Sequence, residues 1–345
     1  MTNEIKKNIR RRKRLFKRAK SRNSEIDWSN FRRMRNIIVS MIRNSKKAYF
    51  SALCEKVNSN NMSSKDWWKT LKAFMEPTSS KYIPPILNPQ TGIAEDDDQV
   101  KANILNHHFT AQSTIDDANH NVPVITIIEP TRTLDAISIT PLEVSDTLKN
   151  LQIGKASGPD GIDNRVLREL IPQLTSPLCN LFNASLSCCQ VPDMWKLSNV
   201  CAVFKKGDPS LPSNYRPISL LNTLEKVFER IIFKHLFNFL QDTDFFTPVQ
   251  SGFMPGDSTV NQLTFLYDKF CNALDNGLEV RAVFFDISKA FDKVWHRGLL
   301  FKLERAGIRG NLLSWFKDYL TNRRQKVVIP GASSDITYTS AGVPQ

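Results

Sequence analysis

The positive charge of this chain is concentrated in its first 50 residues, and this limits what that segment can fold into. Residues 1–50 contain 17 Lys and Arg side chains and three acidic ones, which gives a net charge of +14. The remaining residues carry a net charge of −1. Three acids relieve little of the repulsion among so many cations, so a merely solvated, charged segment is the least favoured interpretation of this basic arm.

Within this arm the densest basic run is IKKNIRRRKRLFKRAKSR, at residues 5–22. Such a block is typical of polyanion binding, because neutralised phosphates release their counterions whatever the nucleic-acid sequence. A nuclear localisation signal and a solvated, partly helical segment are the other interpretations. The candidate nucleic-acid contacts are Arg10, Arg11, Arg12, Lys13, Arg14, Lys17 and Arg18.

Composition excludes some classes of protein. The hydrophobic fraction of 41% suffices for a sizeable core. No apolar run approaches about 18 residues, so we expect no membrane partner, and the charged N-terminus does not resemble a secretory signal. The six cysteines form no zinc-binding pattern. Reduced thiols favour a nuclear or cytoplasmic location.

In the N-terminal half the apolar spacing predicts mainly helices. Apolar residues at helical spacing favour a helix over 26–57, and Ser64 begins a possible short helix that contains Trp67. Residues 76–98 read as a loop, followed by a helix over 97–110. Residues 111–139 resemble a linker with one extended piece at 122–128. We expect the main domain boundary in this linker.

The second half mixes helices and strands irregularly. A capping box at Thr140–Glu143 starts a helix, and residues 196–221 read as a β-hairpin. Further elements are predicted as helices over 163–187, 223–240, 259–275 (capped by Ser258 or Thr259), 296–306 and 310–321, and as strands over 326–330 and 336–342. Because no regular βαβ rhythm appears, we expect an α+β fold.

One further segment, EVRAVFFDI at 279–287, predicts a buried strand that ends in Asp286 and Ile287. An aspartate at the end of an apolar strand lies at the mouth of a sheet, where its carboxylate can hold a divalent metal. Taken alone, such an aspartate is more often a turn residue or a helix cap.

The surroundings of Asp286 resemble a known family. AVFFDISKAFDKVWH resembles the first metal-binding motif of reverse transcriptases of non-LTR retrotransposons (LINE-like, jockey/CR1-type). Further resemblances follow in the family's order: KASGPDGID (155–163), the hairpin region 195–232, QSGFMPGDSTVNQL (250–263), residues 299–327 and AGVPQ (341–345). With WWKTLKAF and KANILNHHFTAQSTID upstream, the resemblance covers about 280 residues.

The resemblance implies a right-hand polymerase, with fingers and a partial palm preceded by a helical basic N-terminal region. It divides the chain into a basic helical arm and linker (1–140), lead-in helices of the fingers (141–189) and a reverse transcriptase domain (190–345). The implied activity is RNA-directed DNA synthesis by two-metal nucleotidyl transfer. The implied partners are an RNA template, a DNA primer and a dNTP, with Mg²⁺ as the cofactor.

The resemblance also implies roles for single residues near the metal site. Asp286 would be the catalytic carboxylate that bridges both Mg²⁺ ions, and the backbone carbonyl of Ile287 would help to hold one of them. Phe291 falls at the family's steric gate against ribonucleotides, where ordinary core packing is the alternative. Asp292 lies past the gate and is better suited to capping the following helix than to binding metal. Gln345 would contact the nucleotide.

In the hairpin, Lys205, Lys206 and Arg216 would bind the triphosphate, and the sequence leaves open which lysine points inward. Gly158 and Gly161 would form a tight turn beside the template strand, or a turn with only a structural role. One departure is Met254, which occupies a position where relatives usually carry arginine.

The other departure is that the family's Tyr-x-Asp-Asp strand does not occur in these residues. One carboxylate cannot hold two magnesium ions against their repulsion. We therefore expect a truncated fragment that is inactive alone and, with an unpaired strand edge, poorly soluble or partly molten. The alternative function is a non-catalytic nucleic-acid-binding remnant, and Phe291 disfavours an RNA-dependent RNA polymerase. The oligomeric state stays open.

Overall fold

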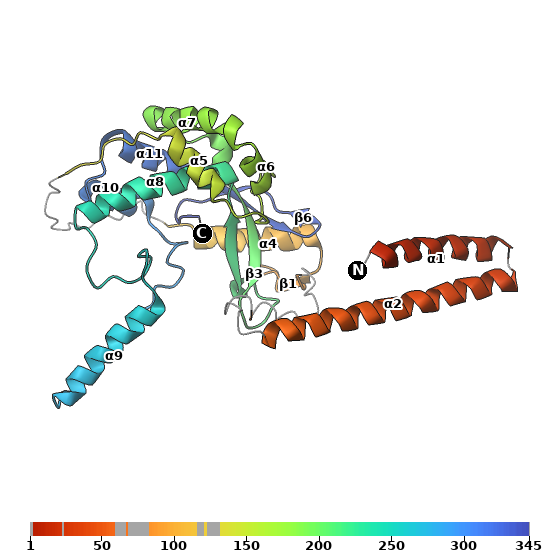
Figure 1. The fold of residues 1–345 in the computed structure, drawn as a ribbon. Helices are drawn as coiled ribbons and strands as arrows, with labels where there is room; N and C mark the ends of the chain where they lie inside the picture. The colour runs from red at the N-terminus through yellow and green to blue at the C-terminus, as the bar shows by residue number, and fades with distance from the viewer. Residues whose placement is uncertain are drawn as a thin grey trace. The chain divides into compact units, whose positions relative to one another are not determined.

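The computed structural model describes residues 3–22, 24–58, 67, 83–115, 121–122 and 132–344. The chain divides into two compact units, Met1–Tyr82 and Ile83–Gln345, and each is described by itself. Figure 1 shows the helices and strands of both units.

The first unit contains two helices, α1 (Asn3–Arg22) and α2 (Glu25–Asn58). Phe16 packs against Phe31 with ring centroids 5.3 Å apart, and the Asn8 Nδ2 atom lies 3.4 Å from the Met41 sulfur. These contacts pair the start of α1 with the middle of α2, so the two helices form an antiparallel hairpin. The helix predicted over 26–57 is confirmed, and the basic run before it is helical as well.

Two sequence predictions fall mostly on residues that the structure does not describe. Of the short helix predicted after Ser64, only Trp67 is described, and it is helical. The extended piece predicted at 122–128 lies outside the described residues except for its first position.

The second unit contains a five-stranded sheet in the order β4-β3-β5-β6, with β7 also paired to β5. Strands β3 (Leu197–Phe204) and β4 (Tyr215–Leu220) form the predicted hairpin. Strand β5 (Arg324–Ile329) lies parallel to β3, whereas β6 (Ala332–Ser333) and β7 (Thr337–Tyr338) are antiparallel to β5. The parallel pairing joins segments more than 120 residues apart.

Helix α4 (Asp98–Gln112) packs on one face of this sheet. It begins where Asp97 accepts a hydrogen bond from the Val100 backbone N–H at 3.0 Å, as a helix N-cap should. Its Leu105 and Phe109 are buried with Val200 of β3 and Val327 of β5. Although the sequence analysis assigned this segment to the arm and linker, its apolar face is covered by the sheet. A small hairpin, β1 (Ile86–Leu87) with β2 (Ala94–Glu95), lies in the predicted loop before it.

A helical layer provides the larger hydrophobic core. Its members are α5 (Pro141–Lys149), α6 (Asn164–Glu169), α7 (Ile171–Cys188), α8 (Thr223–Asp242) and α11 (Gly310–Leu320). The predicted capping box is present, because Thr140 and Glu143 exchange side-chain to backbone hydrogen bonds. The single helix predicted over 163–187 is divided at Leu170. Proline at the start of α7 lacks an amide hydrogen and disfavours a continuous helix there.

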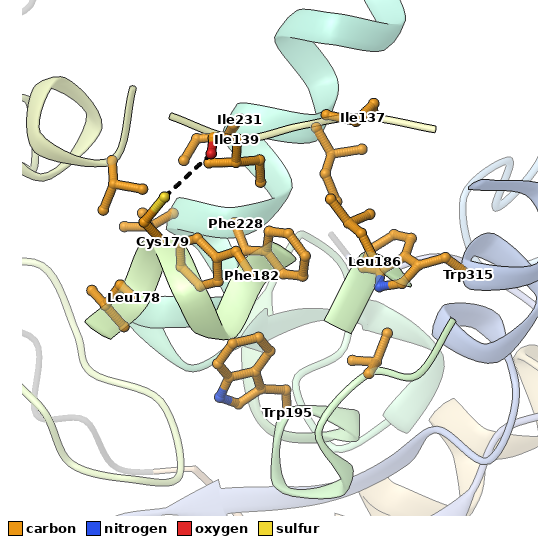
Figure 2. Packing of buried hydrophobic residues seen from close by; sticks show 14 of the residues in the cluster. Ile137, Ile139, Leu178, Cys179, Phe182, Leu186, Trp195, Phe228, Ile231 and Trp315 are labelled. Atoms are coloured by element: carbon orange, nitrogen blue, oxygen red, sulfur yellow. Dashed lines mark hydrogen bonds between the residues drawn. The ribbon is translucent and has the colours of Figure 1, made fainter. Parts of the chain in front are cut away.

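Aromatic side chains fill the centre of this layer (Figure 2). The rings of Phe182 (α7) and Phe228 (α8) stack at 4.5 Å with an interplanar angle of 4°. The indole of Trp315 (α11) meets Phe228 edge-on at 5.3 Å. All three side chains are at most 2% exposed. Such pairs stabilise by about 0.5–1.5 kcal/mol beyond the burial of their area, so this contact holds three distant segments together.

The buried strand predicted over 279–287 was wrong. Residues 278–287 have no strand partner in the part of the chain that the structure describes, and Phe284 and Phe285 are 83% and 92% exposed. A strand requires a neighbour for its backbone groups and a facing layer for its side chains, and neither is present here. Helix α9 (Thr259–Asp275), capped by Ser258 as predicted, precedes this segment and has no buried residue. Helix α10 (His296–Arg305) follows it.

In the second unit, α8 and the turn after α11 share a buried ionic cluster. An Arg323 guanidinium nitrogen donates to Glu225 Oε1 at 2.9 Å, and the two side chains are 6% and 2% exposed. The Tyr319 hydroxyl donates to Glu229, one turn further along α8. Burial raises the pKa of Glu225 to about 8 and also raises the pKa of Glu229. Because two carboxyls share one guanidinium, we infer that the cluster retains a proton at neutral pH.

Among the described helices, none combines the length and the apolar character that crossing a membrane would require.

We predict that Glu225→Gln changes how stability depends on pH. The folded-state pKa of Glu225 is raised from 4.5 to about 8, so the folded chain keeps a proton that the unfolded chain releases within this range. This stabilisation is fully present below pH 4.5 and is lost as the pH rises through about 8. One such proton changes stability by up to about 1.4 kcal/mol per pH unit. Glutamine cannot titrate. As the pH rises through this range, the melting temperature of the variant should therefore fall less than that of the parent.

The matched control is Glu169→Gln on α6, because Glu169 is exposed. This substitution should leave the slope of melting temperature against pH unchanged. If Glu225→Gln also leaves the slope unchanged, Glu225 is ionised in the folded chain and the proton belongs elsewhere.

Candidate active site

The β3–β4 hairpin presents two of its three candidate cations on one face. Arg216 is the cross-strand partner of Val203, so their side chains share a face of the sheet. The Lys205 backbone N–H donates to the Asn214 carbonyl at 2.8 Å, which continues the ladder by one more pairing. By alternation, Lys205 shares the face of Arg216, whereas Lys206 lies in the bend that follows.

This face of the hairpin is open to solvent. Val203 and Ile218 are 44% and 43% exposed, whereas the opposite face is covered by α4. Arg216 and Lys205 are exposed and have no ion-pair partner within the described part of the chain. Their charges are therefore available to an anionic ligand.

The turn between β3 and β4 is held by side-chain hydrogen bonds that the sequence analysis missed. Asp208 Oδ1 accepts from the Ser210 backbone N–H at 2.9 Å and from its hydroxyl at 2.7 Å. The Asn214 side-chain amide donates to the Asp208 carbonyl at 2.9 Å. Hydrogen bonds from Ser210 lower the pKa of Asp208. The Asp-Pro-Ser order is the signal that could have predicted this turn.

Asp286 lies in the unpaired segment and is exposed, as is Ile287 at 75%. The described residues contain no group of three or more His, Cys, Asp or Glu side chains that could hold a metal ion. One exposed carboxylate and a neighbouring carbonyl do not fit a pair of divalent cations, which need several oxygen ligands each. The described residues therefore do not form a complete metal site.

The Phe291–Val294 segment is held by the glycine-containing loop at 341–344. The Val343 N–H donates to the Phe291 carbonyl at 3.0 Å, and the Gly342 N–H donates to the Val294 carbonyl at 2.9 Å. His296 Nε2 lies 2.7 Å from the Gly342 oxygen. These contacts place the described part of the AGVPQ motif (341–344) against Phe291, the candidate steric gate. Gln345 itself lies outside the described residues.

Phe291 is 36% exposed, and its ring meets Phe253 edge-on at 5.8 Å. Asp292 does not cap the following helix as expected, because the residue at the N-cap of α10 is Trp295. Asp292 lines a small pocket together with Arg323, Arg324 and Gly342. Asp292 is half-buried, and this burial raises the pKa of its carboxyl. Packing against the 341–344 loop explains why Asp292 is partly covered.

The glycines of the 155–163 turn have different environments. Gly158 is buried, and a Cβ atom there would lie 2.5 Å from backbone atoms of Leu221 and Asn222. The Asn222 side chain accepts from the Asp160 N–H at 3.1 Å, which fixes this turn to the start of α8. Gly161 is exposed with φ +69° and has open space around its Cα. Close packing therefore explains why position 158 requires glycine, and the positive φ angle explains why position 161 favours it.

We predict that Gly342→Ala releases the 341–344 loop. Gly342 has φ +83°, and a Cβ atom there would lie 2.7 Å from the Asp292 carbonyl oxygen. The left-handed conformation alone costs an L-residue about 1–2 kcal/mol, and the clash adds to this. Hydrogen exchange of the Val343 amide should accelerate by at least about tenfold, the equivalent of 1.4 kcal/mol.

The control is Gly154→Ala, because Gly154 has φ +82° but a Cβ atom there would have no other atom within 4 Å. Equal acceleration at Val343 in both variants would mean that the contact with Asp292 does not hold the loop.

Comparison with known proteins agrees with these features. Residues 203–345 match the family described as reverse transcriptase (RNA-dependent DNA polymerase). Residues 1–59 match a second family, the female sterile protein K10 C-terminal domain, and this match coincides with helices α1 and α2. The first match begins in β3 and includes the hairpin cations, Asp286 and Phe291.

Among the relatives that share most of the chain are two polymerases of Drosophila melanogaster transposons. The probable RNA-directed DNA polymerase from transposon BS is 27% identical, over 100% of this chain and 38% of that protein. The RNA-directed DNA polymerase from mobile element jockey is 29% identical, over 91% of this chain and 34% of that protein. A shorter match to the probable polymerase from transposon X-element is 34% identical over 59% of this chain.

This chain spans 38% and 34% of the length of the first two relatives. The family match and the transposon polymerases agree with the order of motifs found in the sequence. Residues 203–345 of this chain therefore carry the reverse transcriptase domain of a non-LTR retrotransposon.

Proposed function

We propose that the protein containing this chain is an RNA-directed DNA polymerase, and that this chain supplies its fingers and part of its palm. The observation that carries the proposal is the pair of exposed cations, Lys205 and Arg216, on the open face of a braced hairpin. This hairpin lies at the start of the reverse transcriptase match.

The roles of the hairpin residues follow from their chemistry. A guanidinium group donates two parallel hydrogen bonds to phosphate oxygens, and an ammonium group adds a compact point charge. Lys205 and Arg216 would bind the triphosphate of an incoming dNTP from one side. Lys206 would contribute through its long-range charge, because it lies in the bend beyond the paired part of the hairpin.

The remaining roles rest on motif position. Asp286 and the Ile287 carbonyl would contribute to binding of divalent metal ions, which reverse transcriptases generally use, and Mg²⁺ is our proposal for this one. Other ligands would be required, because the described residues do not complete such a site. Phe291 would exclude ribonucleotides, Gln345 would contact the nucleotide, and the Gly158–Gly161 turn would lie beside the RNA template. A nuclear or cytoplasmic location stays a prediction.

We predict that single substitutions in the hairpin separate the two lysines. Lys205→Gln and Arg216→Gln should each weaken binding of a fluorescent dTTP analogue about tenfold, because each removes one charge-assisted contact. Lys206→Gln is the matched control, since it removes the same charge from the adjacent residue. The measurement is fluorescence anisotropy with the chain as it stands. Equal losses in all three variants would mean that diffuse charge, and not the open face, binds the triphosphate.

DNA synthesis requires a longer protein for a fair test. We would exchange the matching segment of the jockey polymerase for this chain and measure primer extension on poly(rA)/oligo(dT) with Mg²⁺. In this chimera Asp286→Asn should reduce synthesis by roughly a hundredfold or more, whereas Asp242→Asn, at an exposed position on α8, should not.

Unchanged synthesis with Asp286→Asn would exclude Asp286 from the catalytic centre. A chimera that is folded and binds the template, but makes no DNA, would instead support a non-catalytic nucleic-acid-binding role for this chain.

A further inference from the structure

The α1–α2 hairpin divides the cations of the basic arm into two groups. The side of α1 that faces α2 carries Ile5, Ile9, Leu15 and Ala19, of which Ile5 and Ala19 are 2% and 0% exposed. Arg12 falls on this same side by helical spacing and is half-buried. Arg18 bends to Asp27 of α2, with its Nε atom 2.9 Å from a carboxylate oxygen. Arg12 is therefore partly covered by the hairpin, and Arg18 is paired within it.

The opposite side of α1 carries a row of four cations between Asn3 and Ser21. At 3.6 residues per turn, the positions directly opposite the buried side are Lys7, Arg10, Arg14 and Lys17. We call these four residues the outer stripe. All four are exposed, and none has a hydrogen-bond or ion-pair partner within the described residues.

The dimensions of the outer stripe suit an extended polyanion. Lys7 and Lys17 are ten residues apart, so the stripe is about 15 Å long at 1.5 Å per residue. Successive charges are about 5 Å apart, which is within one Debye length of about 8 Å at physiological salt. Their mutual repulsion is therefore only partly screened, and a row of phosphates would relieve it. A nucleic-acid strand carries about one phosphate per 3.4 Å of axis, so four to five of them would lie along the stripe.

A lipid surface is a less suitable partner. Helices that lie on membranes insert an exposed apolar side while their cations contact the headgroups. In α1 the apolar side is already packed against α2, through Ile5, Ala19 and the contact of Phe16 with Phe31. Insertion would require the hairpin to open, whereas binding along a phosphate backbone uses it as it is folded.

We propose that the α1–α2 hairpin is a nucleic-acid-binding module that contacts phosphodiester backbones through the outer stripe, separately from the triphosphate site on β3 and β4. Sequence-independent binding is expected, because the four side chains offer charge and carry no arrangement for reading bases. The proposal does not depend on polymerase activity, since it concerns the first unit alone.

The test compares two double variants of the full chain that have the same net charge. Arg10→Gln with Arg14→Gln neutralises two cations of the outer stripe, and Arg12→Gln with Arg18→Gln neutralises two that face α2. Glutamine is a good helix former, and circular dichroism would verify that helix content is retained. Binding to labelled single-stranded RNA, double-stranded RNA and double-stranded DNA would be measured by anisotropy across a salt series, without dNTP.

The outer double variant should reduce the slope of log affinity against log salt for double-stranded DNA by about 1.8, because each phosphate contact contributes about 0.9. At about 0.15 M salt its affinity should fall roughly tenfold. The inner double variant should keep the parent slope and melt at a lower temperature, because Asp27 loses its partner. The three nucleic acids identify which backbone form the stripe prefers.

Equal slopes and affinities for the two double variants would overturn the proposal, because total charge and not the folded face would then determine binding. Tighter binding to vesicles of anionic lipid than to nucleic acid, lost in the outer variant, would overturn it in favour of a membrane surface. Asp242→Asn, at an exposed position on α8, should leave every one of these values unchanged. Failure of the polymerase proposal is recognised separately, because that proposal is tested by primer extension in the chimera.

Discussion

The buried contact between Arg323 and Glu225 fixes the arrangement of the second unit. It attaches the turn after α11 to α8, a helix that enters the aromatic core through Phe228. With that turn held, β5 begins beside β3 and the two strands pair in parallel. Removing Glu225 would be costly, because it would leave the buried Arg323 guanidinium without that hydrogen-bond acceptor and away from water. The sheet that carries the hairpin therefore depends on this contact.

The two parts of the candidate site differ in how well the described residues support them. The hairpin is braced by hydrogen bonds around Asp208 and presents Lys205 and Arg216 on an open face. The segment around Asp286 has no partner strand among the described residues, although the 341–344 loop holds the adjacent Phe291. A hairpin face with two exposed cations and an exposed carboxylate segment thus lie on the same chain. This contrast is why the proposals for triphosphate binding and for catalysis require different experiments.

In the basic arm, as in the larger unit, burial decides which side chains remain exposed and can contact a ligand. Packing of α1 against α2 covers its apolar residues and part of Arg12, pairs Arg18 with Asp27, and leaves the outer stripe exposed. A run of basic residues that looks uniform in the sequence becomes two groups with different roles. One group supports the hairpin, and the other is exposed and can bind phosphate.

The sequence by itself determined the features that depend on near neighbours. The capping box at Thr140, the cap at Ser258 and the β3–β4 hairpin formed as predicted, because each is encoded within a few residues. The ordered motifs likewise identified the family. Only the tertiary structure decided that β5 pairs with β3, that residues 279–287 lack a partner among the described residues and that Lys205 accompanies Arg216. Strand pairing and burial depend on distant segments meeting, and local patterns do not specify which segments meet.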